Sequence, residues 1–404
     1  MLYGIAAATA ALALAAVLVA LLRVPALRVG LVERRQRLRR VPLSGGAAVA
    51  GSTCAVALAG DGLGLAPLGP GAGALLAAAG AVALLGLAAD LWRLKNRFLV
   101  LGTVISATFV IPYDVIGVLG GTVAVTWIAF VALSFRGLDH ADGVAGTVGV
   151  VTAFGVGACA AAEMMDGPVA LLSILAAALT GFLVQGWPHA RVGLGTSGAL
   201  FTGFLLAAVA VRVCAEREPL TGAGTLFALT AVAALDVALV ALSRRRAGRP
   251  LRRPAPDHLA HRLRRLGVTD RGAVVVIGAA AFGGVLTGAL VHTGWTGARA
   301  ALWVAAVATA ALAGLLRVRV YGVRPRRTGE TPARRLPAPG VRRARRAPGD
   351  PDRRRLGPVR RLRGLLSSRR QVPQAPGVTP GVQVQGPRKP ESSQVRAGMR
   401  VRNG

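Results

Sequence analysis

Charged residues are scarce in this sequence, and those that occur are mostly of one sign. Asp, Glu, Lys and Arg make up 16% of the 404 residues, and 49 basic residues stand against 17 acidic ones. Aromatic residues reach only 4%, whereas apolar residues reach 53%. Soluble domains average about 25% charged residues. The composition therefore excludes an ordinary soluble fold and favours a membrane protein with many spans.

Cysteine is also rare, and its spacing excludes two kinds of site. Cys54, Cys159 and Cys214 are scattered through apolar runs, with neither disulfide nor Cys-x-x-Cys spacing. We interpret them as packing residues. The basic residues lie in a few short loops and after Leu316, without interleaved aromatic residues. That pattern argues against a nucleic-acid partner.

Eleven apolar runs are long enough to cross about 30 Å of hydrocarbon. We interpret the first as a retained span and not a signal peptide, because it lacks a basic start and a clear cleavage site. The sequence therefore predicts an all-α, polytopic membrane protein with about 11 transmembrane helices. The runs are residues 2–22, 44–60, 70–89, 98–113, 115–134, 144–162, 168–187, 198–214, 222–243, 272–292 and 299–316.

The loops between these runs alternate in charge. Every second loop is basic, and the loops between them hold few or no Lys and Arg. Basic loops stay in the cytoplasm, which predicts an outside N-terminus and a cytoplasmic C-terminus in the plasma membrane. We expect two domains, a transmembrane domain at 1–316 and a disordered, Arg- and Pro-rich tail at 317–404 that docks anionic lipid or protein.

With this topology, unusual polar residues gather on the cytoplasmic face. Two carboxylates and an imidazole lie in the stretch SFRGLDHADGVAG at 134–146, and Asp236 lies inside a predicted span. Carboxylates, histidines, arginines and glycine-rich turns suit a phosphate-bearing ligand and a hard cation. The whole set is Asp90, Asp139, His140, Asp142, His189, Arg191, Asp236, Asp257, His258 and His261.

Each of these residues also has a structural alternative. Asp90 could simply end a helix at the interface, and Asp139 and Asp142 could cap the helix that follows. His258 and His261 could lie on a solvated helix. Asp236 could form an ion pair with a loop arginine.

Five segments, taken in order, resemble the polyprenyl-phosphate N-acetylhexosamine-1-phosphate transferases, or glycosyltransferase family 4. The family includes the phospho-MurNAc-pentapeptide translocase and transferases that start cell-wall glycan synthesis. RVPLSGG resembles its Pro-x-x-Gly-Gly pattern, and LDHADGVAG resembles Asn-x-x-Asp-Gly-x-Asp-Gly. The segments are 40–46, 87–97, 138–146, 187–204 and 236–267, the last ending in DHLAHRLRRLG, which is similar to a His-x-His-His-Arg-Leu pattern.

The resemblance implies an enzyme that moves HexNAc-1-phosphate from a UDP-sugar to polyprenyl phosphate and releases UMP, with Mg²⁺ on the diphosphate. It implies catalytic roles for Asp90 and Asp142, metal binding by Asp90 and Asp139, and support from Asp236. The implied substrate-binding residues are Arg191, Gly195, Gly198, His258, His261 and Arg262.

The sequence departs from the family pattern where carboxylates are expected. Ala89, Ala145 and Thr196 stand at such positions. Because Ala and Thr cannot supply a charge that holds a divalent cation, Mg²⁺ binding is in question. Three functions therefore stay open: an active transferase, a degenerate relative that binds lipid phosphate or nucleotide-sugar in a regulatory role, and a transporter. A homodimer is a further open alternative.

Overall fold

The computed structural model describes residues 2–33, 41–92, 94–249, 257–318 and 320, and these form twelve helices. All of them fall within one compact unit, Met1–Thr328. The predicted tail from residue 321 onward lies outside the described residues. The helices are α1 (Leu2–Val29), α2 (Gly45–Gly62), α3 (Ala72–Trp92), α4 (Asn96–Thr108), α5 (Tyr113–Leu138), α6 (Val144–Ala162), α7 (Asp166–Gly186), α8 (Gly195–Val213), α9 (Pro219–Arg246), α10 (Leu259–Arg265), α11 (Asp270–His292) and α12 (Ala300–Leu316).

All helices except α10 correspond to the eleven predicted apolar runs. In the part of the chain that the structure describes, eight helices are long and apolar enough to cross a membrane: α1, α3, α5, α6, α7, α8, α9 and α11. Among the others, α4 has 13 residues and α12 has 17. The expectation of a polytopic helical protein is thus confirmed, whereas eleven crossings stay a prediction.

Helix α8 forms the centre of the bundle, since nearly all its residues are buried. Small residues allow its neighbours to approach closely, as is common where helices pack in a membrane. A Cβ atom on Gly46 of α2 would lie 2.1 Å from the backbone nitrogen of Gly198. The hydroxyl of Ser197 donates a hydrogen bond to the carbonyl of Ala83 in α3 at 2.8 Å. These contacts hold α2, α3 and α8 together.

Prolines and glycines set the helix boundaries around α5 and α9. Pro112 precedes α5, which contains one non-helical residue, Gly117 (φ 68°, ψ 175°). Pro219 takes the first position of α9, where its missing N–H costs no helical hydrogen bond. The side chain of Glu218 accepts hydrogen bonds from the backbone of Leu220 and Thr221 and caps this start.

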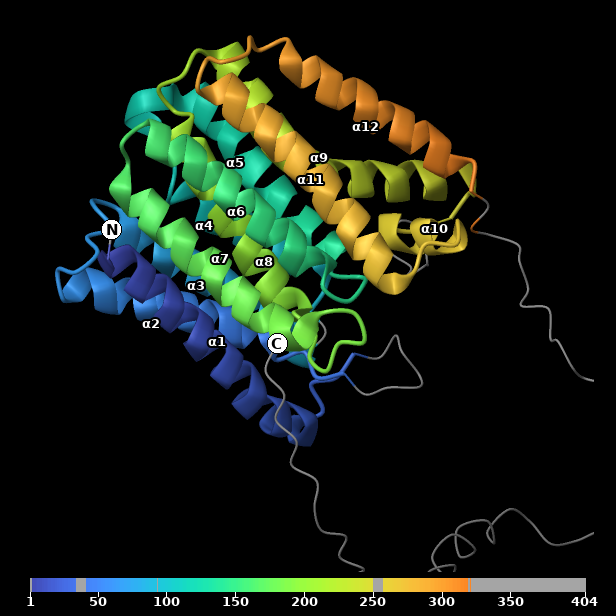
Figure 1. Ribbon diagram of the computed structural model, residues 1–404, viewed down its shortest axis with the longest axis horizontal. Coiled ribbons are helices and arrows are strands. Elements are labelled where there is room, and N and C mark those ends of the chain that lie inside the picture. Colours follow the sequence, from blue (N-terminus) through green and yellow to red (C-terminus); the bar gives the residue numbers. More distant parts are fainter. Residues whose placement is uncertain (1, 34–40, 93, 250–256, 319, 321–404) are drawn as a thin grey trace, which may run out of the picture. The chain divides into compact units, whose positions relative to one another are not determined.

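One end of the bundle carries α10, which lies beside the start of α11 and the end of α12 (Figure 1). We call this the α10 end; it also holds the α5–α6 loop (residues 139–143) and the α7–α8 loop (residues 187–194). At the opposite end, Glu163 forms an ion pair with Arg217, and its Oε1 lies 2.9 Å from Nε2 of His292. Glu163, Arg217 and His292 are not among the ten polar residues singled out in the sequence, so this end carries a separate polar cluster.

Candidate functional site

The α7–α8 loop joins three other segments at the α10 end. Helix α8 begins directly after the loop, and there the backbone N–H of Thr196 donates to Oδ2 of Asp90 at 2.8 Å. The backbone N–H of Ala190 donates to Oδ2 of Asp142 at 3.1 Å. Residues far apart in the chain thus meet at this loop and at the adjoining start of α8. Of the two predicted catalytic carboxylates, Asp142 contacts the loop and Asp90 contacts the start of α8.

The first predicted motif, RVPLSGG at residues 40–46, also contacts the α7–α8 loop. Gly193 donates to the carbonyl of Pro42 at 2.9 Å and accepts from the backbone of Gly45 at 3.1 Å. The segment RVPLSGG therefore lies against the α7–α8 loop. Four of the five segments that carry the family resemblance come together here.

Two glycines of GLGTSG have different surroundings, although both were predicted to bind substrate. Gly195 has a positive φ of 75°, and a Cβ atom there would lie 3.0 Å from Oδ2 of Asp90. A side chain would therefore crowd this carboxylate, and glycine avoids the strain of the left-handed conformation. Gly198 packs against Gly46 and Leu194. Its place in the structure is that of a helix-packing residue.

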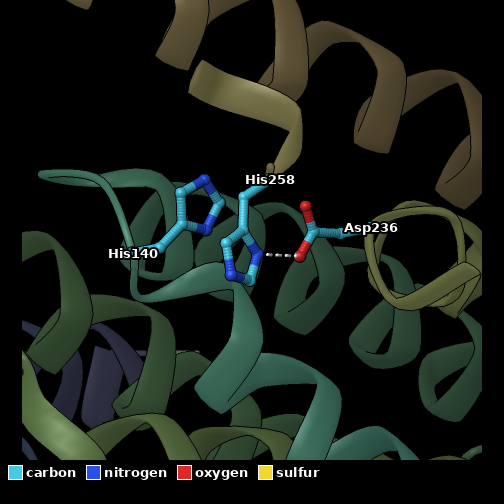
Figure 2. Close-up of side chains that lie close together, drawn as sticks. All are labelled: His140, Asp236 and His258. Atoms are coloured by element: carbon cyan, nitrogen blue, oxygen red, sulfur yellow. Dashed lines mark hydrogen bonds and ion pairs between the residues drawn. The ribbon is translucent and has the colours of Figure 1, made fainter. Parts of the chain in front are cut away.

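The fifth segment adds an aspartate and a histidine. Asp236 is fully buried in α9, and its Oδ2 lies 2.9 Å from Nδ1 of His258 (Figure 2). Its Oδ1 accepts a hydrogen bond from the backbone N–H of Leu259 at 2.8 Å. Both oxygens therefore hold the start of α10. This geometry differs from the alternative of an ion pair with a loop arginine.

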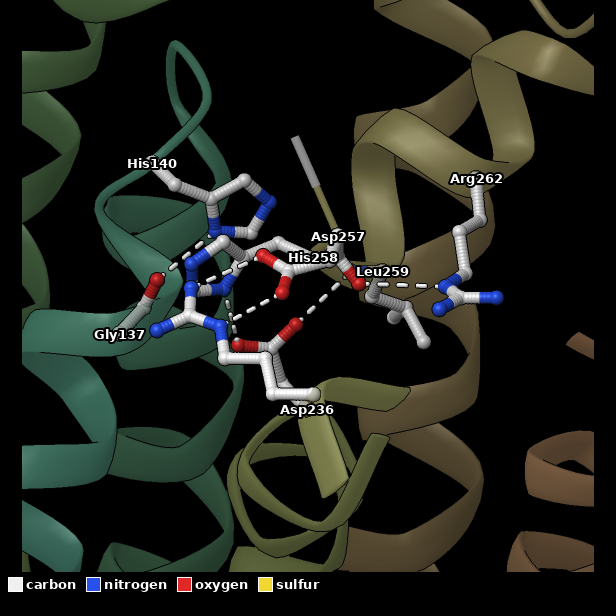
Figure 3. Close-up of polar contacts among 8 residues, drawn as sticks. Gly137, His140, Asp236, Asp257, His258, Leu259 and Arg262 are labelled. Atoms are coloured by element: carbon white, nitrogen blue, oxygen red, sulfur yellow. Dashed lines mark hydrogen bonds and ion pairs between the residues drawn. The ribbon is translucent and has the colours of Figure 1, made fainter. Parts of the chain in front are cut away.

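His140 reaches this pair from the α5–α6 loop. Its ring stacks on His258 with 4.1 Å between centroids and 19° between planes, and its Nδ1 lies 2.7 Å from the carbonyl of Gly137 (Figure 3). Burial, more than any charge nearby, lowers the pKa of His140 from 6.5 to about 3. The ring is therefore neutral near pH 7. It links the α5–α6 loop to α9 and α10.

His261 completes the group of imidazoles. Its ring lies 5.1 Å from that of His140, at 50° between planes. Burial, and then the nearby Arg264 guanidinium, lowers the pKa of His261 to about 4. His258 and His261 thus face protein groups and not mainly solvent, unlike the solvated-helix alternative.

Two arginines near this group are used by the protein itself. Arg244 binds both carboxylate oxygens of Asp257, at 2.6 and 2.9 Å, and both side chains are buried. Arg262 is 1% exposed and donates to the carbonyl of Asp257 (Figure 3). It also donates to the carbonyls of Leu315 and Val318. It therefore ties α10 to the end of α12. We leave Arg262, which was predicted to bind substrate, out of the substrate site.

The remaining predicted residues lie on the loops. Arg191 is exposed on the α7–α8 loop, as is His189, which has a positive φ of 73°. Asp139 follows α5 directly as its C-cap, and Asp142 accepts a hydrogen bond from the backbone N–H of Ala190. Gly143, with a φ of 77°, is the N-cap of α6.

The Mg²⁺ site that the resemblance implies stays a prediction, because the structure describes a different kind of ligand group at the α10 end. Among the described residues, one group of three metal-binding side chains has ligand atoms within 4.8 Å of one another: His140, Asp236 and His258. Mg²⁺ prefers oxygen ligands in octahedral geometry, and this group offers two nitrogens. Among the residues that the structure describes, neither Asp90 nor Asp139 belongs to such a group of three. We therefore derive no step through a metal ion.

Sequence reasoning underrated three residues. His140 was part of the polar stretch but was given no role, and the buried Arg244–Asp257 pair was not predicted. The Arg run at the end of α9 and an Asp 13 residues beyond Arg244 were visible in the sequence. Nothing in that pattern indicated which arginine pairs with Asp257.

Comparison with known proteins agrees with the motifs. The profile of glycosyl transferase family 4 matches residues 72–214. A Streptomyces coelicolor protein, whose name assigns it only provisionally as a glycosyltransferase, is 54% identical over all of this chain and 99% of its own length.

More distant relatives have more specific names. The decaprenyl-phosphate N-acetylglucosaminephosphotransferase of Mycolicibacterium smegmatis is 32% identical over 41% of this chain and 46% of its own length. An undecaprenyl-phosphate N-acetylglucosaminyl 1-phosphate transferase assigned in Bacillus subtilis is 25% identical over 38% of this chain and 43% of its own length. The chain is thus a multi-pass membrane protein and belongs to glycosyl transferase family 4, the polyprenyl-phosphate N-acetylhexosamine-1-phosphate transferases.

Proposed function

We propose that this protein transfers N-acetylhexosamine-1-phosphate from a UDP-sugar to polyprenyl phosphate. A phosphate oxygen of the lipid forms a new bond to the sugar-linked phosphorus of the UDP-sugar. The bond from that phosphorus to the bridging oxygen breaks, and its electron pair leaves on UMP. The products are polyprenyl-diphospho-sugar and UMP. This step needs mainly positioning and neutralisation of phosphate charge.

The observation that carries the proposal is the meeting of all five resembling segments at one end of the bundle. Asp142 contacts the α7–α8 loop and Asp90 contacts the adjoining start of α8, and the loop also contacts Pro42 and Gly45. His140 then joins the α5–α6 loop to His258 and Asp236. A phosphate-bearing ligand at this end would have carboxylates, imidazoles and backbone N–H groups within one region.

We place this end at the cytoplasmic face, with the N-terminus outside, and count eleven crossings. The α10 end carries arginines of the sequence pattern: Arg136 and Arg244 in the last turns of α5 and α9, and Arg191 on the α7–α8 loop. Cytoplasmic loops are enriched in Arg and Lys. This orientation would give the site access to a soluble nucleotide-sugar and to the lipid phosphate. Docking of the tail to anionic lipid or protein, and a homodimer, remain predictions.

In this proposal His258 contacts the substrate, and Asp236 orients the imidazole of His258. The Nδ1 side of the ring is held by Asp236, which leaves Nε2 for a phosphate oxygen or its proton. The side chain of His258 is 16% exposed, so one part of the ring can meet a ligand. Asp142 holds the α7–α8 loop through Ala190, and Asp90 holds the start of α8 through Thr196. Arg191, on the same loop, would neutralise phosphate charge.

The direct test uses the full-length protein in lipid nanodiscs with polyprenyl phosphate and UDP-N-acetylglucosamine. We expect release of UMP together with a lipid-linked sugar phosphate, and loss of both products in His258→Gln. A parallel series with Mg²⁺, Mn²⁺ and EDTA reports the metal requirement. Absence of turnover with each UDP-N-acetylhexosamine, in every metal condition, would contradict catalysis.

The second candidate is a non-catalytic relative that binds the same ligands. Ala89 and Thr196 favour it, because both replace carboxylates of the family pattern next to Asp90. Binding of UDP-sugar or polyprenyl phosphate, measured by thermal shift in the same nanodiscs, without turnover would support it. Failure to bind either ligand would contradict both candidates.

A further inference from the structure

The His140 ring meets its surroundings mainly through its flat face. Its Nδ1 is taken up by the carbonyl of Gly137 in its own loop, at 2.7 Å. Its Nε2 is buried and has no hydrogen-bond partner among the described residues. The face of the ring lies parallel to His258, with 4.1 Å between the centroids. Its contribution at the α10 end is therefore a planar surface against His258.

His258 is held in two directions by two different elements. The hydrogen bond to Asp236 in α9 lies in the plane of the imidazole and fixes the rotation within that plane. The stack with His140 fixes the tilt of the plane itself. Either contact alone leaves one motion free. Together they aim Nε2, the nitrogen opposite Nδ1, in one direction.

A metal ion shared by the two rings does not fit this arrangement. A cation bound by imidazole lies in the ring plane, about 2.0–2.1 Å from the nitrogen. The two ring planes are only 19° apart and the centroids are 4.1 Å from each other. No single position therefore lies in both ring planes and about 2.0–2.1 Å from a nitrogen of each ring. The geometry therefore favours a ring that supports its neighbour over a ring that shares a ligand with it.

We propose that His140 is a positioning residue, which holds the imidazole of His258 flat against its face so that Nε2 is presented to the phosphate of the substrate. This inference rests on the proposed transferase function. It also accounts for a planar ring in LDHADG, at a position that the family pattern leaves open. Planarity and size are what the role requires, and a ring nitrogen is not.

The test compares two substitutions that differ mainly in planarity. His140→Phe keeps a flat ring, whereas His140→Leu keeps apolar bulk without one. We expect His140→Phe to retain kcat within about threefold, and His140→Leu to lower kcat at least tenfold with a smaller change in KM, because small misplacements of a reacting group can cost up to about 10²-fold. If His140→Leu does not fold, His140→Met takes its place.

A second measurement does not depend on turnover. The chain has only 5 histidines, so the imidazole ¹⁵N signals of the full-length protein can be assigned by substitution. We expect the His258 signals to report one tautomer, protonated at Nδ1, in the natural protein and in His140→Phe, and an averaged state in His140→Leu. If the natural protein shows no turnover, the proposed function fails, and this measurement still decides the role of His140.

Three results would overturn the inference. Equal loss of activity in His140→Phe and His140→Leu would show that a ring nitrogen of His140 is needed. If mass spectrometry finds zinc or manganese bound to the natural protein and to neither variant, His140 is a metal ligand. No change in kcat and in the His258 signals in either variant would show that the stack positions nothing.

Discussion

Asp236 and His258 are 22 residues apart in the chain, yet the carboxylate of one lies 2.9 Å from Nδ1 of the other. The second oxygen of Asp236 accepts from the next residue, Leu259. A carboxylate inside a membrane helix costs several kcal/mol unless it is paired or hydrogen-bonded. These two bonds account for its presence there, and they fix the start of α10 at the end of the bundle.

Asp236→Asn should lower kcat by roughly 10²-fold or more if His258 acts on the substrate. His258 and Leu259 bond to different oxygens of Asp236, and an amide replaces one of these oxygens with an NH₂ donor, so one of the two contacts is lost and the imidazole is held less firmly in one tautomer. Product release in nanodiscs measures the effect. Asp114→Asn, at an exposed position near the start of α5, is the matched control. Turnover of Asp236→Asn near that of the control would contradict an orienting role.

Asp257→Ala should destabilise the fold by about 3–5 kcal/mol, because it leaves the buried Arg244 guanidinium without its carboxylate. Thermal unfolding in detergent measures the change. The double variant Arg244→Leu with Asp257→Ala should recover much of the loss, since it removes the unpaired charge as well. A double variant less stable than Asp257→Ala would show that Arg244 is held mainly by other groups.

Acidification should destabilise the protein through its buried imidazoles. The pKa values of His140 and His261 are lowered from 6.5 to about 3 and about 4. Between pH 6.5 and pH 4 the unfolded chain binds protons that the folded chain does not, so stability falls as the pH falls through this window and is constant above it.

Unfolding temperatures measured between about pH 7.5 and pH 5 check this sign, because the range brackets the ordinary histidine pKa. The double variant His140→Phe with His261→Phe should show a weaker dependence on pH. His189→Asn, at an exposed position with positive φ, should leave the dependence unchanged. An equal dependence in all three proteins would place the responsible groups elsewhere.

The sequence predicted most helix positions because apolar length alone sets a membrane span. The run 144–162 coincides with α6, whereas α5 continues to Leu138, past the predicted end at residue 134. The added turn is stable because Phe135 and Leu138 are buried in the bundle. Such packing depends on neighbours that the hydropathy of a single run does not contain.

The residues of the α10 end were predicted as a set, but their partners were not. The order of the motifs predicted that Asp90, Asp142 and His258 lie on one face. The structure adds the partner of each side chain. Arg262 shows the difference. Its motif suggested substrate, whereas its guanidinium meets the carbonyls at the end of α12. A conserved-looking pattern gives the residue type at a position, and only three-dimensional contacts show how its donors are used.

The replacement of family carboxylates gives the sharpest test of the two candidate functions. Thr196 already places its backbone N–H 2.8 Å from Oδ2 of Asp90, and Ala89 is the neighbour of Asp90 in α3. The double variant Ala89→Asp with Thr196→Asp would surround Asp90 with further carboxylates. Oxygen donors of this kind suit Mg²⁺ together with a diphosphate.

If the natural protein binds ligands without turnover, we expect this double variant to release UMP in a Mg²⁺-dependent manner, because the phosphate-binding segments are already in place. Ala89→Asn with Thr196→Asn is the matched control, since it adds similar side chains without charge. Turnover in the aspartate variant alone would show that the natural protein lacks only the cation site. A folded aspartate variant that still binds UDP-sugar but gains no activity would show that the natural protein lacks more than these two carboxylates. Turnover by the natural protein itself would show that catalysis does not need carboxylates at positions 89 and 196.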